Sequence, residues 1–144
     1  MSFVPIPIRD NRVHFIGRQG GTWSCAITLI QYGVDPPTPI DLTEYSVRGQ
    51  IRKTFTDTSP IAAFLCSKVD DLAGKLNILL EAETTAALTA CKTPVDATNY
   101  ANADKSGQFV YDVEICKGTP EVVYRAIQGI IFVDAEVTRL MKSL

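Results

Sequence analysis

The strongest constraint on the fold is the alternating pattern in residues 107–125. Every second residue from Phe109 to Ile115 is apolar or aromatic, and Asp112 and Glu114 lie between them. A period of two is typical of a half-buried β-strand. Residues 117–120 read Lys-Gly-Thr-Pro, which favours a turn, and residues 122–125 begin a returning strand. The pattern therefore predicts a two-stranded ribbon within a β-rich domain.

Composition places the chain among ordinary globular proteins. Its 144 residues fit one domain, and a chain of this length buries about 68–70% of its unfolded surface without metal or disulfide support. A hydrophobic content of 46% and a net charge of −2 disfavour disorder and a nucleic-acid partner, although Arg48, Arg52 and Lys53 form a local basic group. The start has no signal-peptide pattern and no apolar run spans a membrane, so we expect neither export nor membrane insertion.

Further alternating segments recur along the chain at the spacing of strands in a sandwich. They cover residues 12–17, 22–31, 46–55, 61–69, 75–81 and 126–133. Residues 82–90 favour a short helix that must dock on the sheet to be stable. The predicted fold class is all-β: an antiparallel β-sandwich, Ig-like or similar, of seven to eight strands with one short helix near 82–90.

The two ends and one long loop stand apart from this pattern. Residues 1–10 are apolar but contain Pro5 and Pro7, which predicts an extended N-terminal arm in a polyproline-like or edge conformation. Residues 11–139 form the predicted β-sandwich domain, and residues 140–144 form a C-terminal tail. Residues 92–106 are polar and predict a long surface loop, a class that is usually functional or mobile.

The cysteines do not have the spacing of a metal site. Cys25, Cys66, Cys91 and Cys116 are scattered, with no Cys-x-x-Cys pair. We interpret them as small buried hydrophobic residues, and a Cys25–Cys116 bridge is the alternative. No cofactor or metal is expected.

No residue pattern indicates catalysis. His14 is the only histidine and lies in an apolar run, as a partly buried strand residue would. We expect Asp112 and Glu114 to pair with Arg48 and Arg52 across neighbouring strands. The glycine pair in residues 20–21 leads into a strand, whereas a phosphate loop leads into a helix. We therefore expect no catalytic residues and no enzyme activity.

The order of the segments carries a resemblance to a known family. The chain reads Gly-Gly-Thr-Trp-Ser (20–24), Pro-Ile-Asp-Leu-Thr-Glu-Tyr (39–45), Val-Arg-Gly-Gln-Ile-Arg-Lys (47–53), Gly-Lys-Leu-Asn-Ile-Leu-Leu (74–80), Thr-Thr-Ala-Ala-Leu (84–88), Phe-Val-Tyr-Asp-Val-Glu-Ile (109–115) and Gly-Ile-Ile-Phe-Val-Asp-Ala-Glu-Val-Thr-Arg (129–139). This series resembles small structural proteins of tailed bacteriophages. In particular, residues 18–139 are similar to the N-terminal β-sandwich domain of phage baseplate upper proteins and its stand-alone relatives.

The resemblance implies a non-enzymatic virion structural protein that docks to tail, baseplate or neck components. Its expected partners are other phage structural proteins in a multi-copy symmetric assembly, with no nucleic acid and no membrane. Its expected location is the virion, assembled in the host cytoplasm. The arm 1–10 and the loop 92–106 are additions to the family pattern. The lack of a fibre or coiled-coil extension favours a stand-alone virion component over a receptor adaptor.

Candidate interface residues lie in the irregular parts of the chain. They are Phe3, Val4, Ile6, Ile8, Tyr100, Leu140 and Met141. We expect the arm to be disordered in the isolated monomer and ordered in the assembly. One alternative is a capsid decoration or cement protein that stabilises the head. The other is a glycan- or receptor-binding module with Tyr100 as its exposed aromatic residue.

Overall fold

A computed structural model describes residues 3–31 and 35–135. Eight strands form one sheet in the order β1-β2-β10-β9-β6-β7-β8-β3, and β4 and β5 form a separate pair. The strands are β1 (Val4–Arg9), β2 (Arg12–Arg18), β3 (Trp23–Thr28), β4 (Ile30–Gln31), β5 (Thr38–Pro39), β6 (Ser46–Arg52), β7 (Ala62–Asp70), β8 (Lys75–Leu80), β9 (Gln108–Lys117) and β10 (Val122–Asp134). One α-helix, α1 (Ala82–Ala86), and two 3-10 turns, η1 (Tyr100–Asn102) and η2 (Lys105–Gly107), complete the elements.

The predicted ribbon is the antiparallel pair β9–β10, at the centre of the sheet. Phe109, Tyr111 and Val113 are buried on one face of β9, as the alternation predicts. β10 is longer than expected, because the segment at 126–133 continues the returning strand. The register shifts between Arg125 and Ile127, which marks a β-bulge where the two expected segments join.

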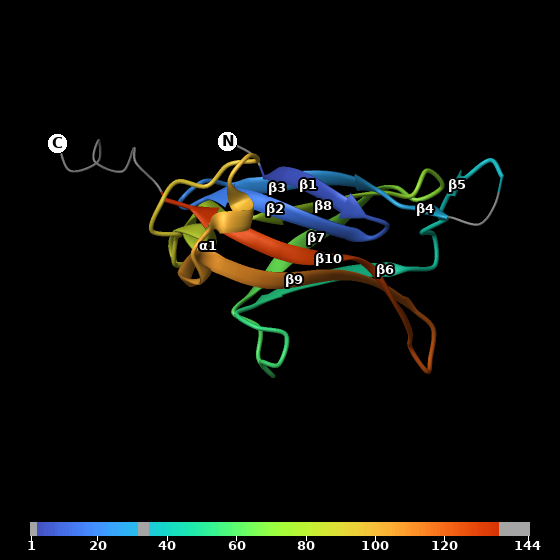
Figure 1. Ribbon diagram of the computed structural model, residues 1–144. Coiled ribbons are helices and arrows are strands. Elements are labelled where there is room, and N and C mark those ends of the chain that lie inside the picture. The colour runs from blue at the N-terminus through green and yellow to red at the C-terminus, as the bar shows by residue number, and fades with distance from the viewer. Residues whose placement is uncertain (1–2, 32–34, 136–144) are drawn as a thin grey trace.

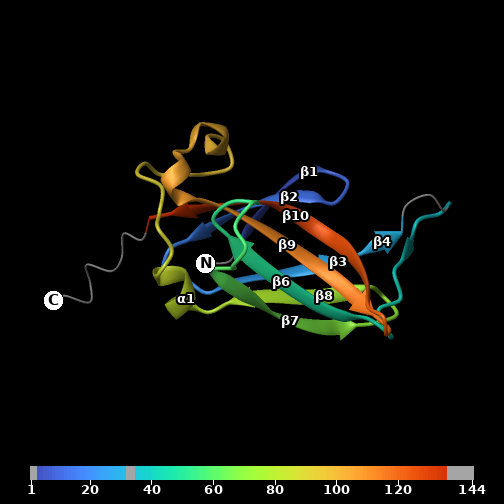
Figure 2. The same ribbon diagram turned by 90° about the horizontal axis from the view of Figure 1, so that it is seen from below.

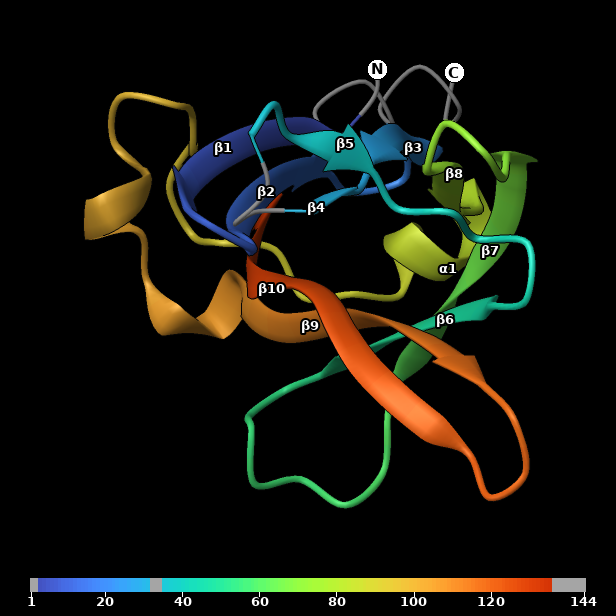
Figure 3. The same ribbon diagram turned by 90° about the vertical axis from the view of Figure 1, so that its right-hand side faces the viewer.

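The sheet is curled and mixed, so the expected antiparallel sandwich is only partly correct. The chain is mostly β with one short helix, but β2 runs parallel to β10. β7 pairs with β6 through Ala62–Phe64 and with β8 through Leu65–Asp70. Figure 3 looks along the interior and shows the sheet curving from β1 and β2 through β10, β9 and β6 to β7 and β8. The β1 and β3 edges thereby come to the same side of the molecule (Figure 1).

The N-terminal arm is an edge strand of this sheet. β1 pairs antiparallel with β2, although Pro5 and Pro7 supply no N–H groups. Phe3 precedes β1 and is 3% exposed, stacked on Phe15 and on Trp23 of β3. The edge conformation was therefore predicted correctly. The expectation of a disordered arm in the isolated chain is wrong, because Phe3 belongs to the core.

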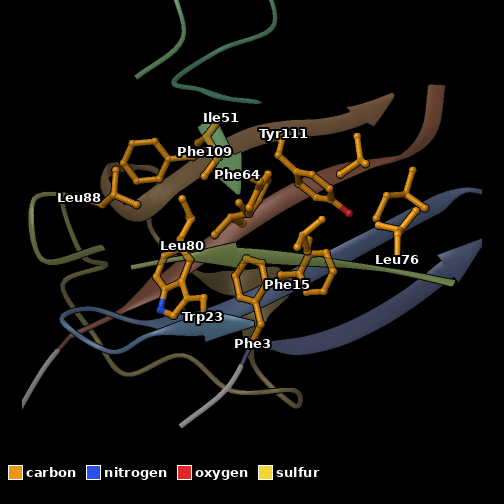
Figure 4. Close-up of a cluster of buried hydrophobic side chains, with 14 of the residues drawn as sticks. Phe3, Phe15, Trp23, Ile51, Phe64, Leu76, Leu80, Leu88, Phe109 and Tyr111 are labelled. Carbon is orange, nitrogen blue, oxygen red and sulfur yellow. The ribbon is translucent and has the colours of Figure 1, made fainter. Parts of the chain in front are cut away.

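The core fills the inside of the curled sheet (Figure 4). Trp23 is fully buried, and its Nε1–H donates to the Arg18 carbonyl at 2.7 Å. Gly17 leaves room for the indole, because a Cβ there would lie 2.3 Å from the ring. The largest fully buried side chains also include Phe15, Leu42, Ile51, Leu76, Ile78, Leu80 and Ile131.

α1 lies at one end of the curled sheet (Figure 2), and it is shorter than the expected helix over 82–90. Thr85 on this helix is fully buried. Its hydroxyl donates to the Gly21 carbonyl at 2.6 Å and accepts from the Gly20 N–H at 3.1 Å. Gln19 also donates to the Leu88 carbonyl at 2.7 Å. The helix and the turn before β3 are thus held together by polar contacts, and they close this end of the core.

The loop 92–106 packs back onto the outside of the sheet. Cys91 and Val95 are buried against Ile16 and Phe132 in a second, smaller apolar cluster. The Val95 N–H donates to the Asp134 carboxylate at 3.0 Å, which ties the loop to the end of β10. The loop therefore covers the outer face of β2 and β10.

Candidate interaction surfaces

The outer face of β6, β9 and β10 is covered by paired charges. The Arg48 Nε lies 3.0 Å from the Glu114 carboxylate, and its Nη1 lies 3.2 Å from Glu121. The Arg125 Nε lies 3.5 Å from Asp112. The expected Arg48–Glu114 pair is present, whereas Asp112 pairs with Arg125 on β10. Arg52 instead donates to the Asp57 carbonyl at 3.1 Å.

A cavity of about 410 Å³ lies on this charged face. Asp112 and Arg125 line it, and Phe55 of the β6–β7 loop stands beside it with 67% of its surface exposed. Burial, followed by the neighbouring Glu114 carboxylate, raises the pKa of Asp112 above its ordinary value. These charges form pairs on a solvent-facing sheet, a common structural arrangement.

The outer face of β7, β8 and β3 has a different character. Cross-strand register places Leu65, Leu79 and Ser24 in one outward row, and Ser67, Asn77 and Ala26 in the next. Of the alternate residues, Leu76, Ile78 and Leu80 are buried, and Cys25 and Cys66 are partly buried. These two outward rows therefore carry no charged side chain. We call the six residues the uncharged face.

Large apolar side chains stand exposed on and beside the uncharged face. Leu65 is 57% exposed, Val69 is 65% exposed and Leu72 in the β7–β8 turn is 74% exposed. Single exposed apolar residues are ordinary on a protein surface, but adjacent ones mark interaction sites. The uncharged face and the exposed residues beside it are therefore a candidate protein interface.

A cavity of about 700 Å³, lined mostly by apolar side chains, lies at the end of the curled sheet opposite α1. Figure 3 views the molecule from this end. We call the cavity the mouth. Leu29, Ile115 and Ile127 line it and are at most 7% exposed, so they belong to the core. Ile30 and Tyr124 stand at its rim, 43% and 53% exposed.

Two tyrosines form one wall of the mouth. The Tyr45 and Tyr124 rings meet edge to face, with centroids 6.3 Å apart. The Lys117 ammonium lies 4.7 Å from the centre of the Tyr45 ring, a cation–π contact. The Asn11 side chain in the β1–β2 turn donates to the Arg125 carbonyl at 3.3 Å and fixes the opposite rim. The mouth is therefore a preformed apolar concavity with a polar rim.

The predicted interface residues differ in how exposed they are in the structure. Val4 and Ile8 are 39% and 40% exposed on β1, so both are accessible along this edge. Ile6 packs against the second apolar cluster, and Phe3 lies in the main core and is not accessible. Leu140 and Met141 lie outside the described residues.

Tyr100 is not an exposed aromatic platform. It is partly buried and meets the Phe132 ring edge-on, with centroids 5.5 Å apart. His14 lies beside it, and the His14 Nδ1 accepts from the Ile130 N–H at 3.1 Å. Burial, followed by the charge of Arg12, lowers the pKa of His14. His14 is thus a partly buried strand histidine, as the sequence predicted.

The four cysteines and the acidic side chains are the remaining reactive groups of the described chain. Cys91 and Cys116 are buried, Cys25 and Cys66 are partly buried, and all four are free thiols. Within residues 3–31 and 35–135, no three His, Cys, Asp or Glu side chains come together to hold a metal ion. No helix in the same ranges is long and apolar enough to cross a membrane.

Sequence reasoning missed both the uncharged face and the mouth. The alternation over residues 61–69 places Leu65 and Ser67 on one face of the strand and Phe64 and Cys66 on the other. Both faces contain apolar residues, so the alternation alone does not show which face is buried. A count of charges by strand face would have found the uncharged face. Nothing in the sequence brings Ile30 and Tyr124 together, because the curl of the sheet does so.

Two comparisons of the chain with known proteins gave no match. No protein-family model matches it, and no curated protein matches its sequence.

Proposed function

We propose that this chain is a non-enzymatic structural protein of a bacteriophage virion, a β-sandwich-like module that docks to tail, baseplate or neck components. The observation that carries the proposal is the uncharged face together with Leu65 on it and Val69 and Leu72 beside it, which are all exposed. The order of sequence segments supports the phage context. The two-sided pairing of β7 supports the sandwich-like description, because it divides the curled sheet into two packed halves.

Burial energies favour this face as the docking surface. Complete burial of a Leu or Val side chain contributes about 1.5–3 kcal/mol, and Leu65, Val69 and Leu72 are each more than half exposed. No charged side chain lies in the two outward rows, so burial of Leu65 there desolvates no ion. Val69 and Leu72 lie next to Asp70 and Asp71 in the chain. In a ring or shell of many copies, avidity multiplies the effect of each small contact.

The β1 edge offers a second contact. Val4 and Ile8 are exposed along it, and an edge strand can pair with a strand of a partner. Pro5 and Pro7 reduce the number of free N–H groups, which favours side-chain contacts over continuation of the sheet. We therefore rank this edge below the uncharged face.

Incorporation into particles tests the proposal. Particles are purified from the phage or induced prophage that encodes the chain, and mass spectrometry measures its copy number. Leu65→Asp and Val69→Asp chains are then supplied in place of the natural one, with Phe55→Asp on the charged face as the matched control. We expect a fixed copy number for the natural chain, strongly reduced incorporation of the first two variants, and normal incorporation of the control.

Two results would contradict the proposal. The first is absence of the chain from purified particles. The second is equal incorporation of all three variants, provided that circular dichroism shows each of them folded. Separation of heads from tails before the measurement distinguishes tail, baseplate or neck docking from the alternative of a decoration protein, which would fractionate with heads.

The glycan-binding alternative has weaker support. Tyr100 is packed against Phe132, and the exposed ring at the mouth, Tyr124, meets the Tyr45 ring edge to face in a cavity lined by both apolar and polar side chains. A sugar site combines an exposed ring with several fixed polar groups. Here the Arg125 guanidinium is already engaged by Asp112 and Gln128.

A further inference from the structure

We propose that β3 is the pairing strand of a symmetric dimer, in which the β3 strands of two copies of this chain lie antiparallel and join their sheets into one. The inference does not rest on the proposed virion function. It concerns one edge of the sheet, whereas the docking variants Leu65→Asp and Val69→Asp lie on β7, so the two proposals can fail independently.

The two edges of the eight-stranded sheet differ in what they offer to a partner strand. β1, at one edge, contains Pro5, Pro7 and Arg9, and its register with β2 is irregular between Pro7 and Arg9. Prolines, bulges and charged side chains are the devices by which proteins protect a strand edge from further pairing. The β1 edge is therefore protected.

β3, at the other edge, has none of these devices. Its six residues contain no proline and no charge, and they pair with β8 in unbroken register. Within residues 3–31 and 35–135, β8 is the only strand that pairs with β3. The outer side of β3 thus presents a row of unpaired N–H and C=O groups, and the structure that matches such a row is another extended strand.

The backbone geometry identifies the groups on this outer side. Directly after β3, the Leu29 N–H donates to the Gly74 carbonyl at 2.8 Å, so Leu29 is bonded on the β8 side. In an antiparallel pair, residues bonded to the partner alternate with residues whose N–H and C=O point away from it. Counted back from Leu29 along the unbroken register, Ser24, Ala26 and Thr28 carry the outward groups. Ala26 and Thr28 are exposed, and Ser24 is half-buried.

A second copy of β3 satisfies all of these groups in one register. With the twofold axis at Ala26, each Ala26 lies opposite its equivalent, and Ser24 lies opposite the second copy's Thr28. A shift by two residues would place Ser24 or Thr28 opposite a residue outside β3 and leave outward groups unpaired. A serine opposite a threonine is also a favourable cross-strand pair. On the inner face, the partly buried Cys25 and Ile27 lie opposite each other and pack together.

The charges around β3 favour a second copy over a foreign strand. A twofold contact brings a segment against itself, and like charges directly opposite each other are destabilising. Residues 19–31 contain no charged side chain, so β3 can meet itself without repulsion. Pairing also continues the uncharged face from one copy to the next, because Ser24 and Ala26 are its outermost members. Since the β1 edge is protected, the association stops at two copies.

The first test measures self-association of the full-length chain by sedimentation velocity between about 1 μM and 1 mM, the range of weak specific contacts. Ala26→Lys places two ammonium groups beside the twofold axis. Ala63→Lys is the matched control, because Ala63 is also an exposed strand alanine but lies on β7 in the interior of the sheet. Circular dichroism and thermal unfolding check that both variants fold. We expect the natural chain and the control to form a dimer and nothing larger, and Ala26→Lys to dimerise at least about tenfold more weakly.

The second test measures the register, and it needs no charged variant to fold. Ala26→Cys is made in a Cys25→Ser chain and treated with oxidised glutathione. Opposite residues of a hydrogen-bonded antiparallel pair have Cα atoms about 5.5 Å apart, which a disulfide spans. Ser24→Cys in the same chain is the control, because its equivalent lies four residues along the second strand, about 14 Å away. We expect a covalent dimer from the first variant and none from the second on a non-reducing gel.

Several results would overturn the proposal. One is a natural chain that stays monomeric throughout the concentration range, including a monomer that takes up only a foreign strand at β3. Another is equal association of Ala26→Lys and Ala63→Lys, whether both are normal or both are weakened, because the contact would then not lie at the β3 edge. A covalent dimer through Ser24→Cys but not through Ala26→Cys would show a different register and would equally overturn it.

Discussion

Phe3 stacks face to face on Phe15, with ring centroids 4.3 Å apart and planes inclined by 7°. Phe3 also stacks on Trp23 at 4.9 Å, so one aromatic side chain at the start of the described chain contacts both β2 and β3. β2 lies next to one edge of the sheet and β3 is the other edge. Phe3 therefore links the two ends of the curled sheet through side-chain packing.

Replacement of Phe3 by alanine should destabilise the fold strongly. A buried Phe→Ala change costs about 3–5 kcal/mol through lost burial and the cavity it leaves. Urea unfolding followed by Trp23 fluorescence measures the change. Val4→Ala, one residue along and 39% exposed, is the control and should cost less than about 1 kcal/mol. Equal effects of the two changes would contradict a core role for Phe3.

Thr85→Val should destabilise the chain by about 1–3 kcal/mol, because it leaves buried polar groups without partners. The Thr85 hydroxyl bonds both the Gly21 carbonyl and the Gly20 N–H, and the valine has nearly the same shape but no hydroxyl. Thermal or urea unfolding measures the effect. Thr89→Val, at an exposed position three residues after α1, should change stability by no more than about 0.5 kcal/mol. An unchanged Thr85→Val protein would show that these bonds do not hold the helix.

Asp112 and Asp96 should titrate on opposite sides of the ordinary aspartate value. Burial raises the pKa of Asp112, whereas hydrogen bonds from the Thr98 side chain and backbone lower the pKa of Asp96. Carboxyl NMR titration of the folded protein measures both. A pKa of Asp112 at or below that of Asp96 would contradict this assignment.

These two pKa shifts change the stability of the fold in opposite directions as the pH falls. In the folded chain Asp112 takes up its proton at a higher pH than in the unfolded chain, so its contribution to stability rises as the pH falls through its folded pKa. Asp96 contributes stability above its unfolded pKa and loses it as the pH falls through its lowered folded pKa. Asp112→Asn should therefore weaken any rise in melting temperature on mild acidification. Asp96→Asn should reduce the loss of stability at lower pH.

The Cys66 thiol should be slow to react in the folded protein. Burial raises its pKa to about 11. At pH 8 its thiolate fraction is then lower than that of a free cysteine by roughly two orders of magnitude. Ellman's reagent followed over time measures the rate, and Cys66→Ser identifies the contribution of this thiol. Urea should release four reactive thiols per chain, because all four cysteines are free. A Cys66 rate equal to that of free cysteine would contradict its burial.

The sequence located most strands because their alternation is local. The ribbon at 107–125, the strands around Val47 and Leu76, and the short helix before Leu88 all follow from residue patterns within each segment. The Arg48–Glu114 pair was also predicted, since it joins two neighbouring strands through ordinary cross-strand pairing. The boundary at residue 125 was wrong, because a bulge interrupts the alternation without ending the strand.

The roles of Phe3 and Tyr100 were not visible in the sequence. Both were predicted as interface residues because each stands in an irregular segment, yet Phe3 joins the main core and Tyr100 the second cluster. Prolines in β1 reduce hydrogen bonding but do not prevent pairing at an edge. Polar residues in the loop 92–106 concealed Val95, Tyr100 and Ala103, which anchor it to the sheet.

The sequence by itself determined that the chain is mostly β, where most strands run, and which residues alternate on each strand. It could do so because the period of two that marks a strand depends only on residues close together in the sequence. Only the tertiary structure decided the parallel pairing of β2 with β10, the curl of the sheet, the uncharged face and the mouth. These features depend on contacts between residues far apart in the chain. Ile30 and Tyr124, for example, line the same cavity although they are far apart in the chain.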